Sequence, residues 1–318
     1  MLLPEAPTAL DGAEHASVRV VAVVPTFHPD AEVFFHVQAL SRQVDRVFVV
    51  DDGSGPGANP LLDSIASDSV IVLRLSNNSG IAAALNTGVR AALADRADYV
   101  LNIDQDTALP DGYVEACLAT FAVANPVTRL GVVCADAVNG APSIPSLRSP
   151  EGLGLVPEAI QSGFVISREC LQMGGLFDER LVIDCVDTEY CVRIRERGFR
   201  IAVATGTDIR HSLGEMVPYR PFGRQVTRDG RPALYQYHSP FRQYYITRNN
   251  IDMVFRFARR HRRWSLAVIK RQIGPTFDAV ASGPQRGRHA IAVLAGTVHG
   301  LARVRGKIPP RLHRLLTR

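Results

Sequence analysis

An alternation of short apolar runs and helix-forming stretches in the first hundred residues constrains the fold most. The apolar runs are rich in β-branched residues, as buried strands are, and the stretches between them carry apolar residues at helical spacing. Such alternation predicts right-handed βαβ units, and hence an α/β fold with a mostly parallel sheet flanked by helices. We expect strands at 18–24, 47–50, 70–75 and 99–103, and helices at 30–43, 61–66 and 81–94.

The first three predicted strands all end in polar or turn-forming residues. Pro25 and Thr26 follow the first strand, Asp52 the second, and Asn78 and Gly80 the third. Because ligands bind at the carboxyl ends of parallel strands, we expect these residues to form one nucleotide-binding rim. A carboxylate can accept hydrogen bonds from a base or ribose, and a glycine lets backbone amides approach a phosphate. Ordinary turn chemistry would explain each residue taken singly.

The fourth predicted strand ends in two carboxylates, Asp104 and Asp106. Residues i and i+2 of a strand share one face, so both side chains can point to the same spot. They would repel each other unless a cation lay between them, and Mg²⁺ or Mn²⁺ holding a diphosphate fits this arrangement. An isolated D-x-D is more often an acidic turn, so the motif depends on its context.

Length and cysteine content limit the class of protein. The 318 residues suffice for one large α/β domain with additions. Five scattered cysteines without C-x-x-C spacing argue against a zinc site or a disulfide framework, and favour a reducing compartment. Residues 1–17 lack the basic and apolar regions of a signal peptide, and we expect a flexible leader there. No apolar run reaches the 18 residues of a membrane span.

The C-terminal region is strongly basic. Between Arg256 and Arg318 the only acid is Asp278. The segments 264–273 and 290–301 are amphipathic with basic flanks, which predicts a helical extension over 251–318 that lies on an anionic membrane. A packing or dimerisation arm, and so a homo-oligomer, is the alternative interpretation.

The ordered series of motifs closely resembles glycosyltransferase family 2, with its GT-A fold. The matching stretches are VVPTFHPD, VFVVDDGSG, LSNNSGIAAALNTGV and YVLNIDQDT, followed by QSG, LVIDCVDTEYCVRIRERGFRI and IRHSLGE. The stretch SPFRQYYITRN resembles the rhamnosyltransferase-like branch. The resemblance spans residues 18–250 and implies a glycosyltransferase domain with those bounds.

The resemblance also implies roles for residues of the second half. Asp187 matches the family's catalytic base. A position at a helix N-terminus would by itself suit a carboxylate, which is the structural alternative. Asp184 is the second candidate for the base. Asp106 and His211 would bind the metal. Residues expected near the sugar or acceptor are Ser162, Gly163, Glu189 and Arg248.

The implied activity is inverting, metal-dependent transfer of L-rhamnose from dTDP-L-rhamnose to a hydroxyl of a lipid-linked or cell-surface glycan. An Asp base would take the hydroxyl proton in a single displacement. We expect a cytoplasmic enzyme, peripheral on the inner face of the cell membrane.

Two other classes of protein share some of these sequence features. A nucleic-acid-binding protein would use the basic C-terminus, but the acidic strand ends would repel a phosphate backbone, so no nucleic-acid partner is expected. A nucleotidyltransferase also has carboxylates at strand ends, but the sequence lacks a basic glycine-rich loop after its first strand.

Overall fold

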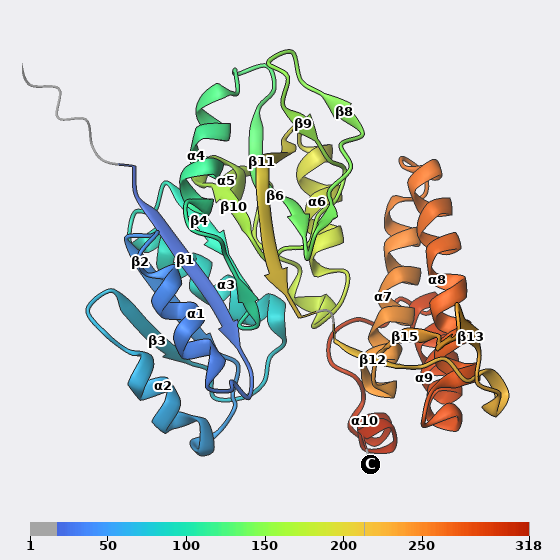
Figure 1. The fold of residues 1–318 in the computed structure, drawn as a ribbon. Helices are drawn as coiled ribbons and strands as arrows, with labels where there is room; N and C mark the ends of the chain where they lie inside the picture. Colours follow the sequence, from blue (N-terminus) through green and yellow to red (C-terminus); the bar gives the residue numbers. More distant parts are fainter. Residues whose placement is uncertain (1–17, 213, 318) are drawn as a thin grey trace, which may run out of the picture.

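The computed structural model describes residues 18–212 and 214–317. A central sheet covered by helices forms the first part, and a group of helices with two small two-stranded sheets forms the second (Figure 1). The expected leader, residues 1–17, lies outside the described residues.

The central sheet confirms the expected α/β class. Its order is β3-β2-β1-β4-β10-β6-β11-β9-β8, with β1, β2, β3 and β4 parallel and β10 antiparallel to both of its neighbours. β11 again runs parallel to β6. The main strands are β1 (Val20–Thr26), β2 (Arg46–Asp51), β3 (Val70–Arg74), β4 (Tyr99–Asn102), β6 (Leu130–Val138), β10 (Phe164–Ser167) and β11 (Arg200–His211); the short ones are β5 (Thr107–Ala108), β7 (Ala141–Pro142), β8 (Leu147–Arg148) and β9 (Gly154–Leu155).

Both faces of this sheet are buried, which explains why its strands are continuously apolar. Along β1, Val21 and Val23 pack with α3, α5 and α6 on one face. Val20, Ala22 and Val24 point to the other face, into the core with α1, α2 and α4. The helices are α1 (Glu32–Leu40), α2 (Asn59–Ile65), α3 (Ile81–Ala94), α4 (Tyr113–Val123), α5 (Arg168–Gly174) and α6 (Val186–Glu196).

The C-terminal part is helical, as expected, but it begins earlier than residue 251. That predicted boundary falls inside the continuous helix α7. Tyr244 and Tyr245 of α7 are buried in a small core with residues of α9 and α10. The elements of this part are β12 (Glu215–Pro218), β13 (Thr227–Arg228), β14 (Arg231–Pro232), β15 (Leu234–Tyr237), α7 (Pro240–Phe257), α8 (Arg262–Ser282), α9 (Arg286–Leu301) and α10 (Pro310–Thr317).

Within the ranges described above, no helix combines the length and the apolar character needed to cross a bilayer.

Candidate active site

The site lies where the order of the parallel strands reverses. From β1 the chain proceeds to β2 and β3 on one side, whereas β4 pairs with the other side of β1. A crevice forms at the carboxyl ends of such strands, and ligands of open α/β sheets bind there. The Gln105 side chain bridges this crevice by accepting the backbone N–H of Phe27 (2.9 Å).

Asp52 organises the loop that follows β3. Its carboxylate is buried and accepts the backbone N–H groups of Ser79 (2.5 Å) and Gly80 (2.8 Å). Burial raises the pKa of Asp52, while these two hydrogen bonds and the charge of Lys307 act against the rise. Gly80 has φ +97°, and a Cβ there would lie 2.6 Å from the carbonyl oxygen of Val182, so only glycine fits.

A cavity of about 630 Å³ lies beside this loop, within the range of small-molecule sites. Five residues predicted from the strand ends line it: Pro25, Thr26, Asp52, Asn78 and Gly80. The opposite wall comes from the C-terminal part and was not predicted. It includes Phe241, Tyr245, Lys307, Ile308, His313 and Thr317.

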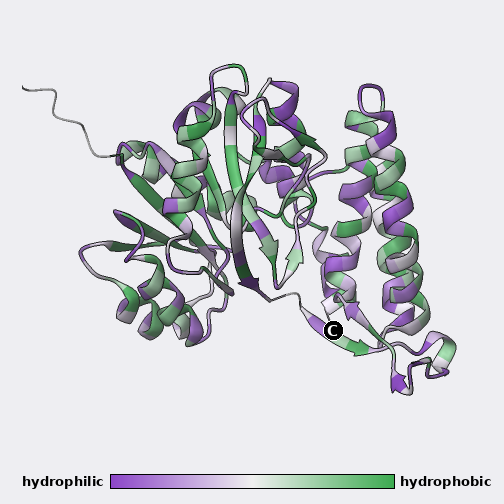
Figure 2. Cartoon of the chain, turned by 45° about the horizontal axis from the view of Figure 1, so that its top comes forward, coloured by the Kyte–Doolittle hydropathy of each residue, from purple (hydrophilic) through white to green (hydrophobic). Residues whose placement is uncertain are grey.

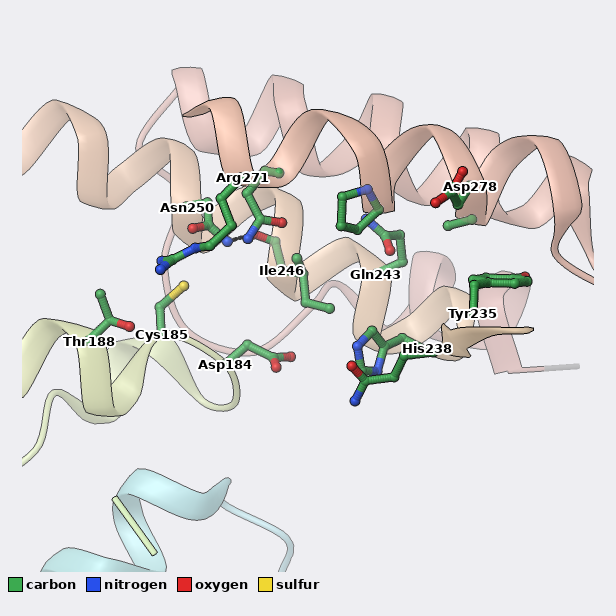
Figure 3. A pocket seen from close by; sticks show the side chains of 14 residues that line it. Asp184, Cys185, Thr188, Tyr235, His238, Gln243, Ile246, Asn250, Arg271 and Asp278 are labelled. Atoms are coloured by element: carbon green, nitrogen blue, oxygen red, sulfur yellow. Dashed lines mark hydrogen bonds between the residues drawn. The ribbon is translucent and has the colours of Figure 1, made fainter. Parts of the chain in front are cut away.

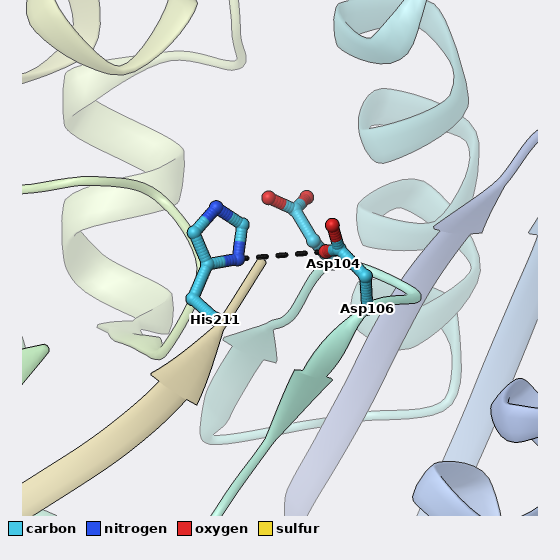
Figure 4. Close-up of side chains that lie close together, drawn as sticks. All are labelled: Asp104, Asp106 and His211. Carbon is cyan, nitrogen blue, oxygen red and sulfur yellow. Dashed lines mark ion pairs between the residues drawn. The ribbon is translucent and has the colours of Figure 1, made fainter. Parts of the chain in front are cut away.

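Asp104, Asp106 and His211 meet at one edge of this crevice (Figure 4). Their ligand atoms all lie within 4.8 Å of one another, and His211 Nδ1 is 3.4 Å from Asp106 Oδ1. Sheet register explains the meeting, because β5 pairs with β11 so that His211 lies opposite Thr107. Two carboxylates and an imidazole form a donor set that fits Mn²⁺ better than Mg²⁺.

The QSG stretch and Thr107 fix the position of Asp104. Ser162 Oγ accepts the Asp104 N–H (2.9 Å), and the Gln161 side-chain amide donates to the Asp104 carboxylate. Thr107 Oγ1 lies 2.7 Å from Ser162 Oγ and 2.8 Å from His211 Nδ1. Burial, and then the charge of Asp106, raise the pKa of Asp104 to about 7. A cation between these carboxylates would relieve that repulsion, so the residues present fit a metal ion.

Asp187 lies in the first turn of α6, as predicted. Its carboxylate accepts the N–H of Thr188 (2.7 Å), and burial raises its pKa. The pKa values of Asp104 and Asp184 are raised mainly by burial, and the charge of Asp187 raises both further. The three carboxylates are therefore electrostatic neighbours. Asp184, the second candidate for the base, is paired with Arg242 (3.1 Å).

Comparison with known proteins agrees with this geometry. The Glycosyl transferase family 2 model matches residues 22–142. The Shigella flexneri dTDP-rhamnosyl transferase RfbF is 26% identical over 244 residues, which cover 73% of this chain and 78% of RfbF.

Residues 22–142 thus carry a glycosyltransferase family 2 domain, and most of the chain is similar to a rhamnosyltransferase.

Solved structures show the same fold. S. aureus TarS residues 1–349, in complex with UDP-GlcNAc, superimpose with a TM-score of 0.53 at 14% identity, covering 94% of this chain and 84% of that one. The longer TarS structure gives a TM-score of 0.50 at 15% identity over 94% of this chain; the match spans 50% of TarS. At such identities the likeness concerns the GT-A fold alone.

Two residues of the glycosyltransferase that we expected near the sugar or acceptor are turned inward. Glu189 is 0% exposed and pairs with Arg193 (2.9 Å) and Arg256 (2.7 Å). Arg248 is 1% exposed and donates to the carbonyl oxygens of Leu181 (3.1 Å) and Gly306. With their charged groups engaged inside the protein, both residues are structural, and we correct the expectation that they contact sugar or acceptor.

Arg248 and its neighbour Asn249 stabilise the segment directly before α6, which contains Asp184. The Asn249 side-chain amide donates to the carbonyls of Leu181, Ile183 and Asp184 (2.8–3.0 Å). This support matters because Val182, Asp184 and Cys185 adopt positive φ angles, which are unfavourable for residues other than glycine.

Ser162 and Gly163 lie behind the acidic cluster. Ser162 is buried and bonded to Asp104 and Thr107. Gly163 has φ +91°, and its carbonyl accepts the Tyr113 hydroxyl (2.5 Å). Their contacts in the structure are with the D-x-D segment and the core, so direct contact with sugar or acceptor stays a prediction.

Proposed function

We propose that this glycosyltransferase moves L-rhamnose from dTDP-L-rhamnose to a hydroxyl of a glycan acceptor, with inversion at the anomeric carbon. The observation that carries the proposal is the Asp104–Asp106–His211 cluster, whose two carboxylates flank Gln105, a residue that lines the cavity of about 630 Å³. The name of the relative RfbF supports the choice of donor.

In this proposal the nucleoside lies in the cavity next to Thr26 and Asp52, and the diphosphate extends toward the acidic cluster. Asp106 and His211, with Asp104 beside them, would hold a divalent cation. When bound, such a cation supplies positive charge to the departing diphosphate. Lys307 lies on the same cavity wall and adds a further positive charge.

The acceptor hydroxyl attacks the anomeric carbon as the bond from that carbon to the diphosphate oxygen breaks. Asp187 takes the hydroxyl proton, and the nucleoside diphosphate leaves with the bonding electrons. A raised pKa makes the Asp187 carboxylate a stronger base than a carboxylate in water. Attack from the face opposite the leaving group inverts the anomeric configuration.

Replacing Asp106 tests the cation site. We expect Asp106→Ala to abolish Mn²⁺-dependent binding of dTDP while the unfolding temperature stays unchanged, because Asp106 is exposed and supplies a ligand rather than packing. Isothermal calorimetry with and without Mn²⁺ measures this. Asp111→Ala, at an exposed position of the following turn, is the control. Equal dTDP affinity in Asp106→Ala and wild type would contradict the assignment.

Replacing Asp187 separates a base from a helix-terminal carboxylate. Asp187→Asn should keep donor binding and lower turnover by about 10²–10⁴, the usual contribution of a positioned base. If Asp187 only stabilised the helix terminus, asparagine would serve nearly as well and turnover would barely change. Asp184→Asn is the matched variant; full turnover in Asp187→Asn with collapse in Asp184→Asn would move the base to Asp184.

We also propose that the C-terminal helices bind the surface of an anionic membrane. Leu266, Ile269, Ile273 and Phe277 form an exposed apolar stripe along α8, and part of it lines an apolar groove with α7 and α9. Figure 2 shows hydrophobic residues along these helices, interspersed with hydrophilic ones. Arginines and two lysines account for nearly all charges in this region, so the charge favours anionic lipid headgroups.

Point substitutions test this surface better than truncation, because removing the last helices would take away Lys307 and Ile308 from the nucleotide cavity. Ile273 and Phe277 are 65% and 53% exposed, so Ile273→Ser with Phe277→Ser should fold normally. We expect the double variant to lose at least tenfold in partitioning to phosphatidylglycerol vesicles, measured by sedimentation, since each buried side chain contributes about 1.5–3 kcal/mol.

The control for the membrane test is Val127→Ser, which replaces an 86% exposed apolar residue on the sheet domain. Equal sedimentation of the double variant and wild type would refute membrane binding by this surface. Light scattering of the same samples would reveal a dimer interface as the alternative use of the groove.

A further inference from the structure

A second, polar cavity of about 360 Å³ lies on the other side of residues 182–188 from the proposed nucleotide cavity beside Asp52. Asp184 and Thr188 form one wall, at the start of α6 (Figure 3). Val182 and Ile183, directly before them in the chain, line the nucleotide cavity. The short segment 182–188, which contains Asp187, therefore separates the two cavities. Asp187 itself lines neither cavity, but its neighbour Thr188, whose N–H donates to the Asp187 carboxylate, lines the polar one.

The lining of the polar cavity is rich in uncharged hydrogen-bonding groups. Gln243, Asn250 and Gln272 contribute side-chain amides, and Tyr235 contributes a hydroxyl. The Tyr235 hydroxyl is buried and has no hydrogen-bond partner among the residues that the structure describes. Because a buried hydroxyl without a partner is unfavourable, a ligand that bonds to it would satisfy a group that the protein leaves open.

The charged groups of this cavity exclude a polyphosphate. Asp278, the only acid between Arg256 and Arg318, lines the cavity from α8, and Asp184, which is paired with Arg242, lines it just before α6 (Figure 3). Burial lowers the pKa of His238 to about 4, so its ring is neutral at pH 7. Among the described residues that line the cavity, Arg271 carries a positive charge. Carboxylates, amides and an aromatic ring together suit the hydroxyl groups of a neutral sugar.

We infer that this cavity, between α6, α7, α8 and β15, is the acceptor subsite and binds a neutral sugar residue that presents one hydroxyl to Asp187. Asp278 and the Tyr235 hydroxyl bind other hydroxyls of that residue. The inference rests on the proposed function, because it assumes that the nucleotide cavity holds the donor. It adds the chemical class of the acceptor group and the residues that select it.

Two conservative substitutions test the subsite. Tyr235→Phe removes only the hydroxyl without a partner, and Asp278→Asn removes one negative charge. The matched controls are Tyr237→Phe on the same strand and Glu215→Gln on the neighbouring strand β12, neither of which lines the cavity. All four variants should fold, which thermal unfolding verifies.

The probes are the methyl glycosides of L-rhamnose, D-glucose, D-galactose and N-acetyl-D-glucosamine, observed by saturation-transfer NMR on the full chain with Mg²⁺ and dTDP present. We expect at least one glycoside to bind the wild type. Its Kd should rise about threefold to tenfold in Tyr235→Phe and about tenfold or more in Asp278→Asn, as expected for loss of a neutral and a charged hydrogen bond. Both controls should keep the wild-type Kd.

Binding of no glycoside to the wild type, or an equal loss in variants and controls, would overturn the inference. Displacement of the glycoside by dTDP would also overturn it, because the two would then share one cavity. Calorimetry of dTDP binding to the same proteins distinguishes a failure of the acceptor subsite from a failure of the proposed function. If the wild type binds dTDP but no glycoside, only the acceptor subsite is refuted. If the wild type does not bind dTDP at all, the proposed function itself is refuted.

Discussion

The parallel pairing of β1 with both β2 and β4 is the constraint on which the site depends. The register aligns Thr26 with Asp51 and Val23 with Asn102, so the residues that follow these strands leave the sheet at one edge. Carboxylates with raised pKa values gather there, and Asp104 is held in place by hydrogen bonds from Gln161 and to Ser162. Such crowded carboxylates are unfavourable alone, and the fold tolerates them where a cation and a charged ligand can bind.

The C-terminal helices complete this site. Helix α7 bonds to the carbonyls of the segment before α6 through Arg248 and Asn249, and so supports its left-handed residues. The chain beyond α9 then returns to the sheet domain, where Lys307 donates to the carbonyl of Asn78. The cavity beside Asp52 and the polar cavity therefore both have walls made from the two parts of the chain, and a change in either part alters them.

The sequence was informative wherever local pattern determines structure. Alternating apolar runs predicted the sheet, and the helix expected at 81–94 has those bounds. Spacing does not reveal whether a charged side chain meets a ligand or an internal partner, which is why Glu189 and Arg248 were assigned wrongly. The cavity wall at Lys307 and Ile308 depends on contacts across more than two hundred residues, and no local motif marks it. The short strands β7, β8 and β9 lie in a stretch rich in Gly, Pro and Ser, where no alternation of apolar residues marks them.

Anomalous diffraction from crystals grown with Mn²⁺ and dTDP tests the central claim most directly. We predict a manganese peak at Asp106 and His211, next to the diphosphate, with the thymine in the cavity beside Thr26 and Asp52. A peak elsewhere, or a nucleotide bound in the polar cavity next to Asp278, would contradict it.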